Sequence, residues 1–283
     1  MQNPHAQWRI QYARGLTEKL VVLQGVRAVI VAGSVARNYA DAYSDLEIPI
    51  FWDVLPDDER RLEIAEVLSG RFLFAYDGPS REDQLLMDGV QVDLWHIAVR
   101  HEEEIIRAVL HDHRTDLDFL NAMDTIRCCI PLYGEELIRE WKRQAEEYPV
   151  GLARRIITEH IASFRVDQLK TCARRDDPTG FYDQLRFLQQ QVFLVLLALN
   201  RCYFPSFKWI YPALKNMAIK PQAIGERFRR GYAATHDQAA ADMQQILIET
   251  MRLVEEQFPR IDTDTAHRRM AHRRRATDGP KKG

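Results

Sequence analysis

The chain has 283 residues, of which 46% are hydrophobic and 28% are charged, and its formal net charge is -2. This length is enough for two modest domains, each with a core of its own. The near-neutral charge argues against a protein whose main partner is bulk nucleic acid, and it favours small-molecule or protein substrates.

The first part of the chain has the pattern of an α/β domain. Residues 5–23 place apolar side chains at four-residue spacing, which predicts an amphipathic helix, and residues 29–32 form a short apolar strand. Residues 57–68 predict a second helix with an acidic start, and residues 71–77 a further strand. Residues 84–99 indicate a β-hairpin that turns at Asp88-Gly89, since this dipeptide accepts the positive φ angles of a type I′ turn.

Residues 28–52 contain the most informative local pattern, a strand, a tight turn, a short helix, a loop and a second strand. Gly33 ends the first strand and permits the turn. Ser34 follows at the position of a helix N-cap, where its hydroxyl and the next backbone N–H groups suit an anion such as phosphate. Asp45 and Glu47 open the second strand, and the strand period of two puts both carboxylates on one face, close enough to share a cation.

The segment GSVARNYADAYSDLE, residues 33–47, resembles the polymerase-β-like nucleotidyltransferase superfamily. The Asp-x-Glu form is similar to that of the antibiotic nucleotidyltransferases that modify aminoglycosides. The resemblance implies a metal-dependent transferase in which Asp45 and Glu47 bind Mg²⁺ together with an acidic residue on a later strand. It also implies that Gly33 and Ser34 contact the phosphates of a nucleotide.

Asp93, in the triplet VDL, is the candidate for that third carboxylate. Alternation along the predicted strand puts Val92 and Leu94 on the apolar face and Asp93 on the other face. The alternative is a solvent-facing aspartate on an exposed hairpin. The resemblance favours the metal-binding role.

Two residues in or near the motif depart from the pattern of the relatives. Asn38 stands where many of them have glycine, so we expect an asparagine that tolerates a positive φ angle. Pro49 lies within the second strand and cannot donate a ladder hydrogen bond, which predicts a strand that is bulged or at an edge near it.

Beyond residue 101 the sequence is almost wholly helical in pattern. We therefore predict an α+β protein: a small mixed β-sheet nucleotidyltransferase domain over residues 1–130, an all-α helical bundle over residues 135–258, and a basic, disordered tail over residues 259–283. The periodic segments of the helical part are residues 102–111, 117–126, 134–148, 151–175, 181–204 and 241–258.

One turn in the helical half is a second candidate for nucleotide contact. Lys208 and Trp209 lie in the aromatic-rich segment NRCYFPSFKWIYPAL, which resembles a segment of bacterial nucleotidyltransferases of unassigned substrate. The lysine is expected to reach the triphosphate, and the aromatic ring to stack on a base. The alternative is an interhelical turn packed by its aromatic side chains, with Lys208 in solvent.

The cysteines and the N-terminal segment bear on location. Residues 1–15 lack the apolar core of a secretory signal, and the longest apolar run, residues 192–199, is far shorter than the ~20 residues that span a bilayer. We expect a cytoplasmic protein without membrane contact. The cysteines have no CxxC spacing and are interpreted as reduced thiols: Cys128, Cys129, Cys172 and Cys202.

The function expected from this resemblance is transfer of a nucleoside monophosphate from an NTP, with ATP the expected donor, to a hydroxyl of an acceptor. Mg²⁺ held by Asp45, Glu47 and Asp93 is the expected cofactor, and pyrophosphate leaves. A small-molecule acceptor is favoured over protein or RNA. The alternative is a regulatory or antitoxin-like protein that keeps the fold with weak catalysis. The sequence leaves the acceptor and the oligomeric state open.

Overall fold

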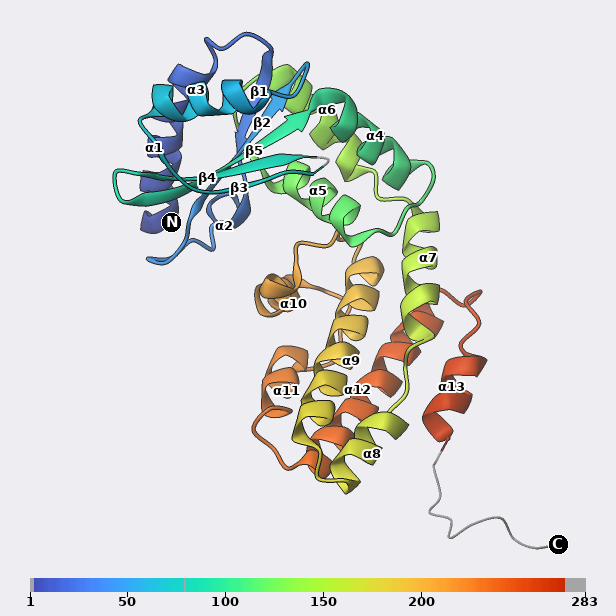
Figure 1. The fold of residues 1–283 in the computed structure, drawn as a ribbon. Coiled ribbons are helices and arrows are strands. Elements are labelled where there is room, and N and C mark those ends of the chain that lie inside the picture. The colour runs from blue at the N-terminus through green and yellow to red at the C-terminus, as the bar shows by residue number, and fades with distance from the viewer. Residues whose placement is uncertain (1–2, 79, 273–283) are drawn as a thin grey trace, which may run out of the picture. The chain divides into compact units, whose positions relative to one another are not determined.

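The computed structural model describes residues 3–78 and 80–272, and the chain divides into two compact units between Glu147 and Tyr148. The architecture is α+β, as the sequence predicts: the first unit contains a mixed sheet with helices, and the described part of the second unit is helical (Figure 1).

Among the described residues, the sheet has six strands in the order β3-β4-β5-β2-β1-β6 (Figure 1). The two central strands, β2 (Leu46–Trp52) and β5 (Val90–Ala98), run parallel, and every other neighbouring pair is antiparallel. The remaining strands are β1 (Val26–Val31), β3 (Arg71–Tyr76), β4 (Arg81–Met87) and β6 (Ile130–Tyr133).

The predicted hairpin is confirmed. Met87 of β4 pairs with Val90 of β5, and the two residues between them have φ angles of 51° at Asp88 and 80° at Gly89. Two positive φ angles are what a two-residue type I′ turn requires. The turn is also fixed to the first helix, because the hydroxyl of Tyr12 donates a hydrogen bond to Asp88 Oδ2 at 3.0 Å.

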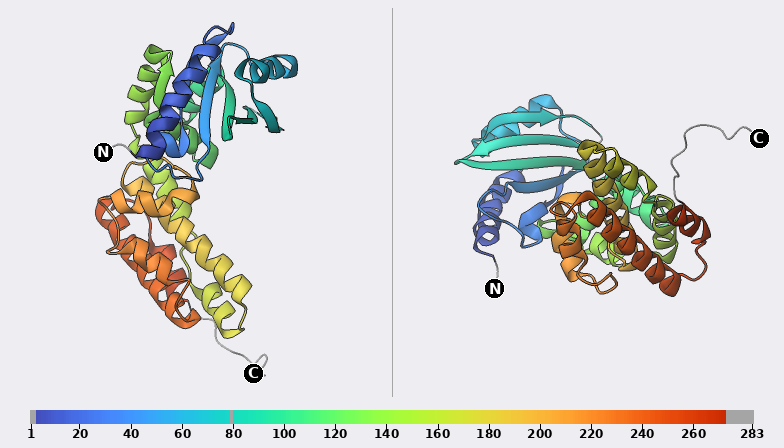
Figure 2. Two further views of the ribbon diagram at one scale, coloured as in Figure 1. Left: turned by 90° about the vertical axis from the view of Figure 1, so that its left-hand side faces the viewer. Right: turned by 90° about the horizontal axis from the view of Figure 1, so that it is seen from below.

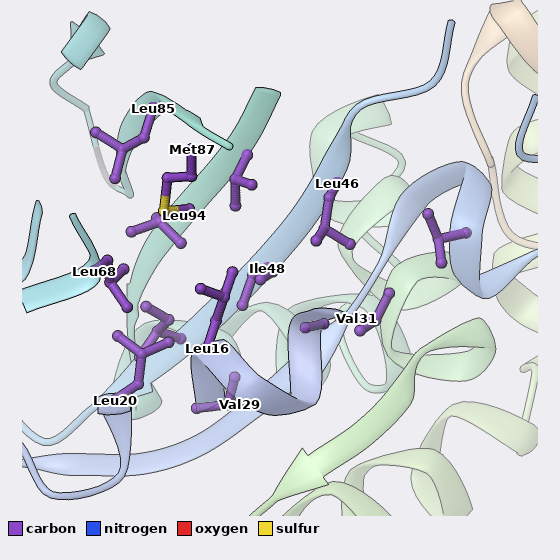
Figure 3. Packing of buried hydrophobic residues seen from close by; sticks show 14 of the residues in the cluster. Leu16, Leu20, Val29, Val31, Leu46, Ile48, Leu68, Leu85, Met87 and Leu94 are labelled. Atoms are coloured by element: carbon purple, nitrogen blue, oxygen red, sulfur yellow. The ribbon is translucent and has the colours of Figure 1, made fainter. Parts of the chain in front are cut away.

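One face of the sheet carries the main hydrophobic core under helices α1 (Pro4–Leu20) and α3 (Asp58–Leu68). Figure 3 shows Leu16, Ile48 and Leu94 gathered in this layer. Ile48 and Leu94 are fully buried, so the alternate residues of β2 and β5, which include Glu47 and Asp93, face the other side of the sheet.

The other face is covered by α4 (Val99–Leu110), α5 (Leu117–Cys128) and α6 (Glu135–Glu146). Phe51 of β2 meets Trp141 of α6 edge to face, with ring centroids 4.9 Å apart. The two faces therefore differ in what covers them, and the face that carries the acidic residues lies against α4, α5 and α6.

The first unit extends past the domain boundary expected near residues 130–135, because β6 and α6 belong to it. Pro131 lies within β6, and this strand is at the edge of the sheet, where a missing N–H group is tolerated. Val31 of β1 pairs with Ile130, so the strand completes the sheet.

The expectation that Pro49 marks an edge strand or a bulge is wrong. Strand β2 lies between β5 and β1, and its parallel register with β5 runs unbroken, with Pro49 opposite Trp95. The register pairs with β1 run from Val26↔Trp52 to Val29↔Ile50, and beyond them the backbone N–H of Ala32 still donates to the carbonyl oxygen of Glu47 at 3.0 Å. The two strands therefore stay in contact on both sides of Pro49, and the proline removes one N–H group from this contact without ending it.

In the second unit, the single long helix expected over residues 151–175 is two helices, α7 (Val150–Ile161) and α8 (Asp167–Arg174). The chain turns between them and buries Phe164 and Val166, which an uninterrupted helix would place differently. Figure 2 shows two long helices of this unit running alongside each other, α9 (Pro178–Leu199) and α12 (His236–Gln257). The shorter elements are the 3-10 helix η1 (Phe207–Trp209), α10 (Ile210–Asn216), α11 (Ile224–Arg230) and α13 (Asp264–Ala271).

Helix α13 corrects the expectation of a disordered tail from residue 259 onward. Ala266 and Met270 on this helix are buried, so it packs rather than projecting into solvent. Residues 273–283, the rest of the expected tail, lie outside the described residues. Among the helices of the described chain, none combines the length and the apolar character needed to cross a membrane.

Candidate functional site

The turn after β1 leads into the short helix α2 (Gly33–Ala36) and brings the backbone of Gly33 against the carboxylate of Glu47. Gly33 has a φ angle of +59°, and a Cβ atom built on it would lie 2.4 Å from both Cδ and Oε2 of Glu47. The backbone N–H of Ala32 donates to the carbonyl oxygen of Glu47 at 3.0 Å. Glycine is therefore needed here both for the backbone angle and for the close approach of Glu47.

Ser34 lies within α2 rather than at its N-cap, which corrects the sequence prediction. The N-cap position is held by Ala32, and Ser34 is the second residue of the helix. The Ser34 side chain is buried, and its Oγ atom has no hydrogen-bond partner among the described residues. A buried hydroxyl without a partner is unusual, and contact of Ser34 with a nucleotide phosphate stays a prediction.

The three predicted carboxylates come together at one end of the two central strands. Glu47 and Asp93 are direct register partners across β2 and β5, and Asp45 comes one residue before β2. Asp93 is buried at 5% exposure, so it is not the solvent-facing hairpin aspartate of the alternative interpretation. Burial raises the pKa of Asp93 to about 6, and the negative charges of Asp45, Glu82 and Glu47 act in the same direction.

The donor chemistry of this group fits a hard divalent cation, since carboxylate oxygens are the ligands that Mg²⁺ prefers. In the part of the chain that the structure describes, however, no set of three or more histidine, cysteine, aspartate or glutamate side chains is placed to hold a metal. Glu47 lies against Gly33, and Asp93 Oδ1 accepts a hydrogen bond from Gln91 Nε2 at 3.1 Å. Mg²⁺ binding by Asp45, Glu47 and Asp93 stays a prediction.

A buried ion pair holds the Gly33 turn in place, and the sequence did not predict this pair. Arg37 Nη1 donates to the carbonyl oxygen of Gly33 at 3.0 Å, and its Nε and Nη2 atoms both donate to Asp124 Oδ2 on α5. The two side chains are 8% and 12% exposed. Arg37 was detectable in principle, because it stands four residues after Gly33 in the motif. Asp124 lies 87 residues away in sequence, and nothing local indicates it.

The loop that leads to Asp45 is held by the first helix. Arg9 is buried, and it donates to the carbonyl oxygens of His5, at 2.9 Å, and of Ser44. The backbone N–H of Asn3 donates to Asn38 Oδ1 at 2.9 Å. Asn38 has a φ angle of 60°, which confirms that this position requires a residue tolerant of positive φ. These contacts set the path of the loop that presents Asp45.

Lys208 lies in η1 of the second unit and is exposed. Its Nζ atom is 5.3 Å from the centroid of the Trp209 ring, a cation–π distance. The structure describes this turn only within its own unit, so a contact between Lys208 and a nucleotide held at Ser34 stays a prediction.

Comparisons with known proteins give limited similarity. Residues 132–210 match a family described as a domain of unknown function, DUF4037. No curated protein matches significantly. The solved structures include a similar one, of a nucleotidyltransferase-like protein from Exiguobacterium sibiricum 255-15, at 10% sequence identity and a TM-score of 0.41; the match covers 87% of this chain and 74% of that one. A TM-score at this level establishes no shared fold, and the functional proposal below therefore depends on the residues of this chain.

Proposed function

We propose that the protein is a nucleotidyltransferase that moves a nucleoside monophosphate from an NTP, with ATP as the expected donor, to a hydroxyl group of an acceptor. One observation carries this proposal: the register pairing of Glu47 with Asp93, beside Asp45 and against the Gly33 turn. Acidic side chains are costly to bring together and bury, and the raised pKa of Asp93 reflects that cost. A bound cation would remove the repulsion between these carboxylates, so cation binding would explain why they are buried next to each other.

In the proposed reaction the acceptor oxygen attacks the α-phosphorus of the NTP. The bond from that phosphorus to the bridging oxygen breaks, pyrophosphate leaves, and the proton of the acceptor hydroxyl passes to solvent water. Mg²⁺, when bound, supplies charge neutralisation at the phosphates and lowers the pKa of the attacking hydroxyl. Asp45, Glu47 and Asp93 are the side chains of this chain proposed to hold it.

The remaining residues of the site position the nucleotide. Gly33 lets a phosphate approach the backbone, because no Cβ atom stands in the way. The Ser34 hydroxyl, which lacks a partner among the described residues, is proposed to donate a hydrogen bond to a phosphate oxygen. Arg37 acts through the turn: it holds the Gly33 carbonyl group and is itself fixed by Asp124.

The test is release of pyrophosphate from each labelled NTP in the presence of Mg²⁺ and a panel of hydroxyl-bearing acceptors, small molecules first. The proposal expects Mg²⁺-dependent release together with a nucleotide-shifted acceptor. Asp45→Asn is expected to abolish release, because the amide keeps the shape and loses the charge. Asp53→Asn is the matched control, since Asp53 follows the other end of β2 in an exposed pair with Arg27.

The regulatory or antitoxin-like alternative makes the opposite prediction. A protein that keeps only the fold would bind neither Mg²⁺ nor NTP at this site, and Asp45→Asn would leave its partner binding unchanged. If the parent chain neither binds Mg·ATP nor releases pyrophosphate with any acceptor, the transferase proposal fails and this alternative takes its place. A cytoplasmic location remains part of the proposal.

A further inference from the structure

A cavity of about 470 Å³ lies within the first unit, between the sheet and helices α4 and α5. Its walls include Pro49 and Phe51 of β2, Trp95 and Ile97 of β5, and Phe119 of α5. These strand residues alternate with the core residues of β2 and β5, so the cavity lies on the same face as the three carboxylates. Glu47 itself forms part of its wall, and the cavity therefore adjoins the proposed transfer site.

Glu102, on the first turn of α4, is the unusual residue of this cavity. Its side chain lines the cavity and is only 3% exposed, and its Oε1 atom has no hydrogen-bond partner among the described residues. Burial raises the pKa of Glu102 to about 7. A buried carboxyl oxygen without a partner is costly, and such an atom needs an explanation. None of the roles assigned above uses it.

The composition of the wall indicates what kind of ligand would supply the missing partner. Besides Glu102, the wall contains the acidic residues Glu47 and Asp118 and the histidine His101, and none of the described residues that form it is a lysine or an arginine. Phe51, Trp95 and Phe119 add aromatic rings, whose faces attract cations. Negative charge together with aromatic walls favours an organic cation with an apolar body over an anion.

We propose that this cavity binds a small organic amine, with its ammonium group on the Glu102 carboxylate and its apolar body between the sheet and helices α4 and α5. The role of this amine as acceptor, through a hydroxyl directed toward Glu47, rests on the proposed transferase function. The binding itself does not, because it requires only the cavity and Glu102.

Binding is tested on the full chain without nucleotide or Mg²⁺, at pH 8, where the Glu102 carboxyl is mostly ionised. The probes are phenethylamine, the neutral 2-phenylethanol and the anionic phenylacetate, followed by calorimetry and by the fluorescence of Trp95 in the wall. Phenethylamine is expected to bind at least about tenfold more tightly than either of the others, since hydrogen bonds to charged groups are the stronger class. Equal binding of the three probes, or no binding of phenethylamine, would overturn the proposal without any variant.

Two variants assign the preference to Glu102. Glu102→Gln keeps the shape of the side chain and removes its charge, so the tenfold preference for phenethylamine is expected to vanish while 2-phenylethanol binds as before. Glu103→Gln is the matched control, because Glu103 is the next residue on the same helix and is exposed. Retention of the preference in Glu102→Gln, or its loss in Glu103→Gln, would contradict the assignment.

A third variant tests whether the probes bind inside the cavity, by reducing the volume of the cavity. Ala122→Leu adds side-chain atoms to the wall on α5 and is expected to weaken phenethylamine and 2-phenylethanol together. Unchanged binding of both would place them elsewhere and overturn the proposal. The transfer assay tests the other proposal separately. Amine binding by a protein that releases no pyrophosphate would support the amine site and overturn the transferase function. Pyrophosphate release without a preference for the amine would support the transferase function and overturn the amine site.

Discussion

Replacement of Gly33 by alanine is the perturbation that best separates stability from turnover. The backbone at Gly33 has a φ angle of +59°, and an L-residue in that region costs about 1–2 kcal/mol. For a unit of this size, that corresponds to a fall in Tm of about 2–8 °C. The new Cβ atom would also start 2.4 Å from the Glu47 carboxyl carbon, and an ordinary contact begins at 3.4 Å. The carboxylate must therefore move by about 1 Å, and a displacement of that size in a reacting site costs roughly 10²-fold in rate.

The assay is pyrophosphate release with Mg·NTP and acceptor, measured beside thermal unfolding of the same samples. Gly89→Ala is the matched control: Gly89 has a φ angle of +80°, and a Cβ atom there would meet nothing within 4 Å. The control is expected to lose a similar amount of stability and no turnover. Near-parent turnover in Gly33→Ala, or an equal loss of turnover in Gly89→Ala, would refute the reasoning that the approach of Glu47 matters for catalysis.

Four further outcomes are expected. Asp45→Asn should abolish Mg²⁺-dependent turnover with an unchanged Tm, and normal turnover would remove Asp45 from the metal site. Ser34→Ala should weaken Mg·NTP binding measured by calorimetry without lowering Tm, because the Oγ atom makes no hydrogen bond to the described residues; equal affinity would count against the phosphate contact. Lys208→Ala should raise the KM for NTP or lower kcat with little change in Tm, whereas unchanged kcat/KM would return this residue to the solvated-turn interpretation. The folded-state pKa of Glu102, about 7, lies above its usual 4.5, so unfolding free energy should fall by up to ~3 kcal/mol as pH rises from 4.5 to 8. Chemical denaturation should show this loss in the parent chain and in Glu103→Gln, and a clearly smaller one in Glu102→Gln, where the raised pKa of Asp93 still contributes; the same slope in all three would contradict it.

The parts of the fold that the sequence predicted depend on short-range chemistry. The Asp88-Gly89 turn, the positive φ of Asn38 and the outward face of Asp93 each follow from residue type and a period of two. The register pairing of Glu47 with Asp93 was predictable only in part. The sequence places each residue on the face of its strand that is away from the core, but it does not show that the two strands are neighbours.

The parts that the sequence did not predict depend on long-range packing. Pro49 predicts an edge strand or a bulge, whereas it lies on a central strand between β5 and β1. The N-cap expectation for Ser34 failed by two residues, because the chain starts α2 directly at Gly33. Asp124, which holds Arg37, and Glu102, which lines the cavity, come from helices whose contacts with the sheet no local pattern specifies.

The central claim is that Asp45, Glu47 and Asp93 form the metal site of a nucleotide. The most direct measurement is a titration with Mn²⁺, followed by electron paramagnetic resonance, in the presence and absence of a nonhydrolysable ATP analogue. The account predicts that the parent chain binds Mn²⁺ tightly only with the nucleotide, and that Asp93→Asn weakens this binding at least about tenfold, since the loss of one charged ligand is worth more than 1.4 kcal/mol. Mn²⁺ binding that is equal in the parent chain and in Asp93→Asn would contradict it.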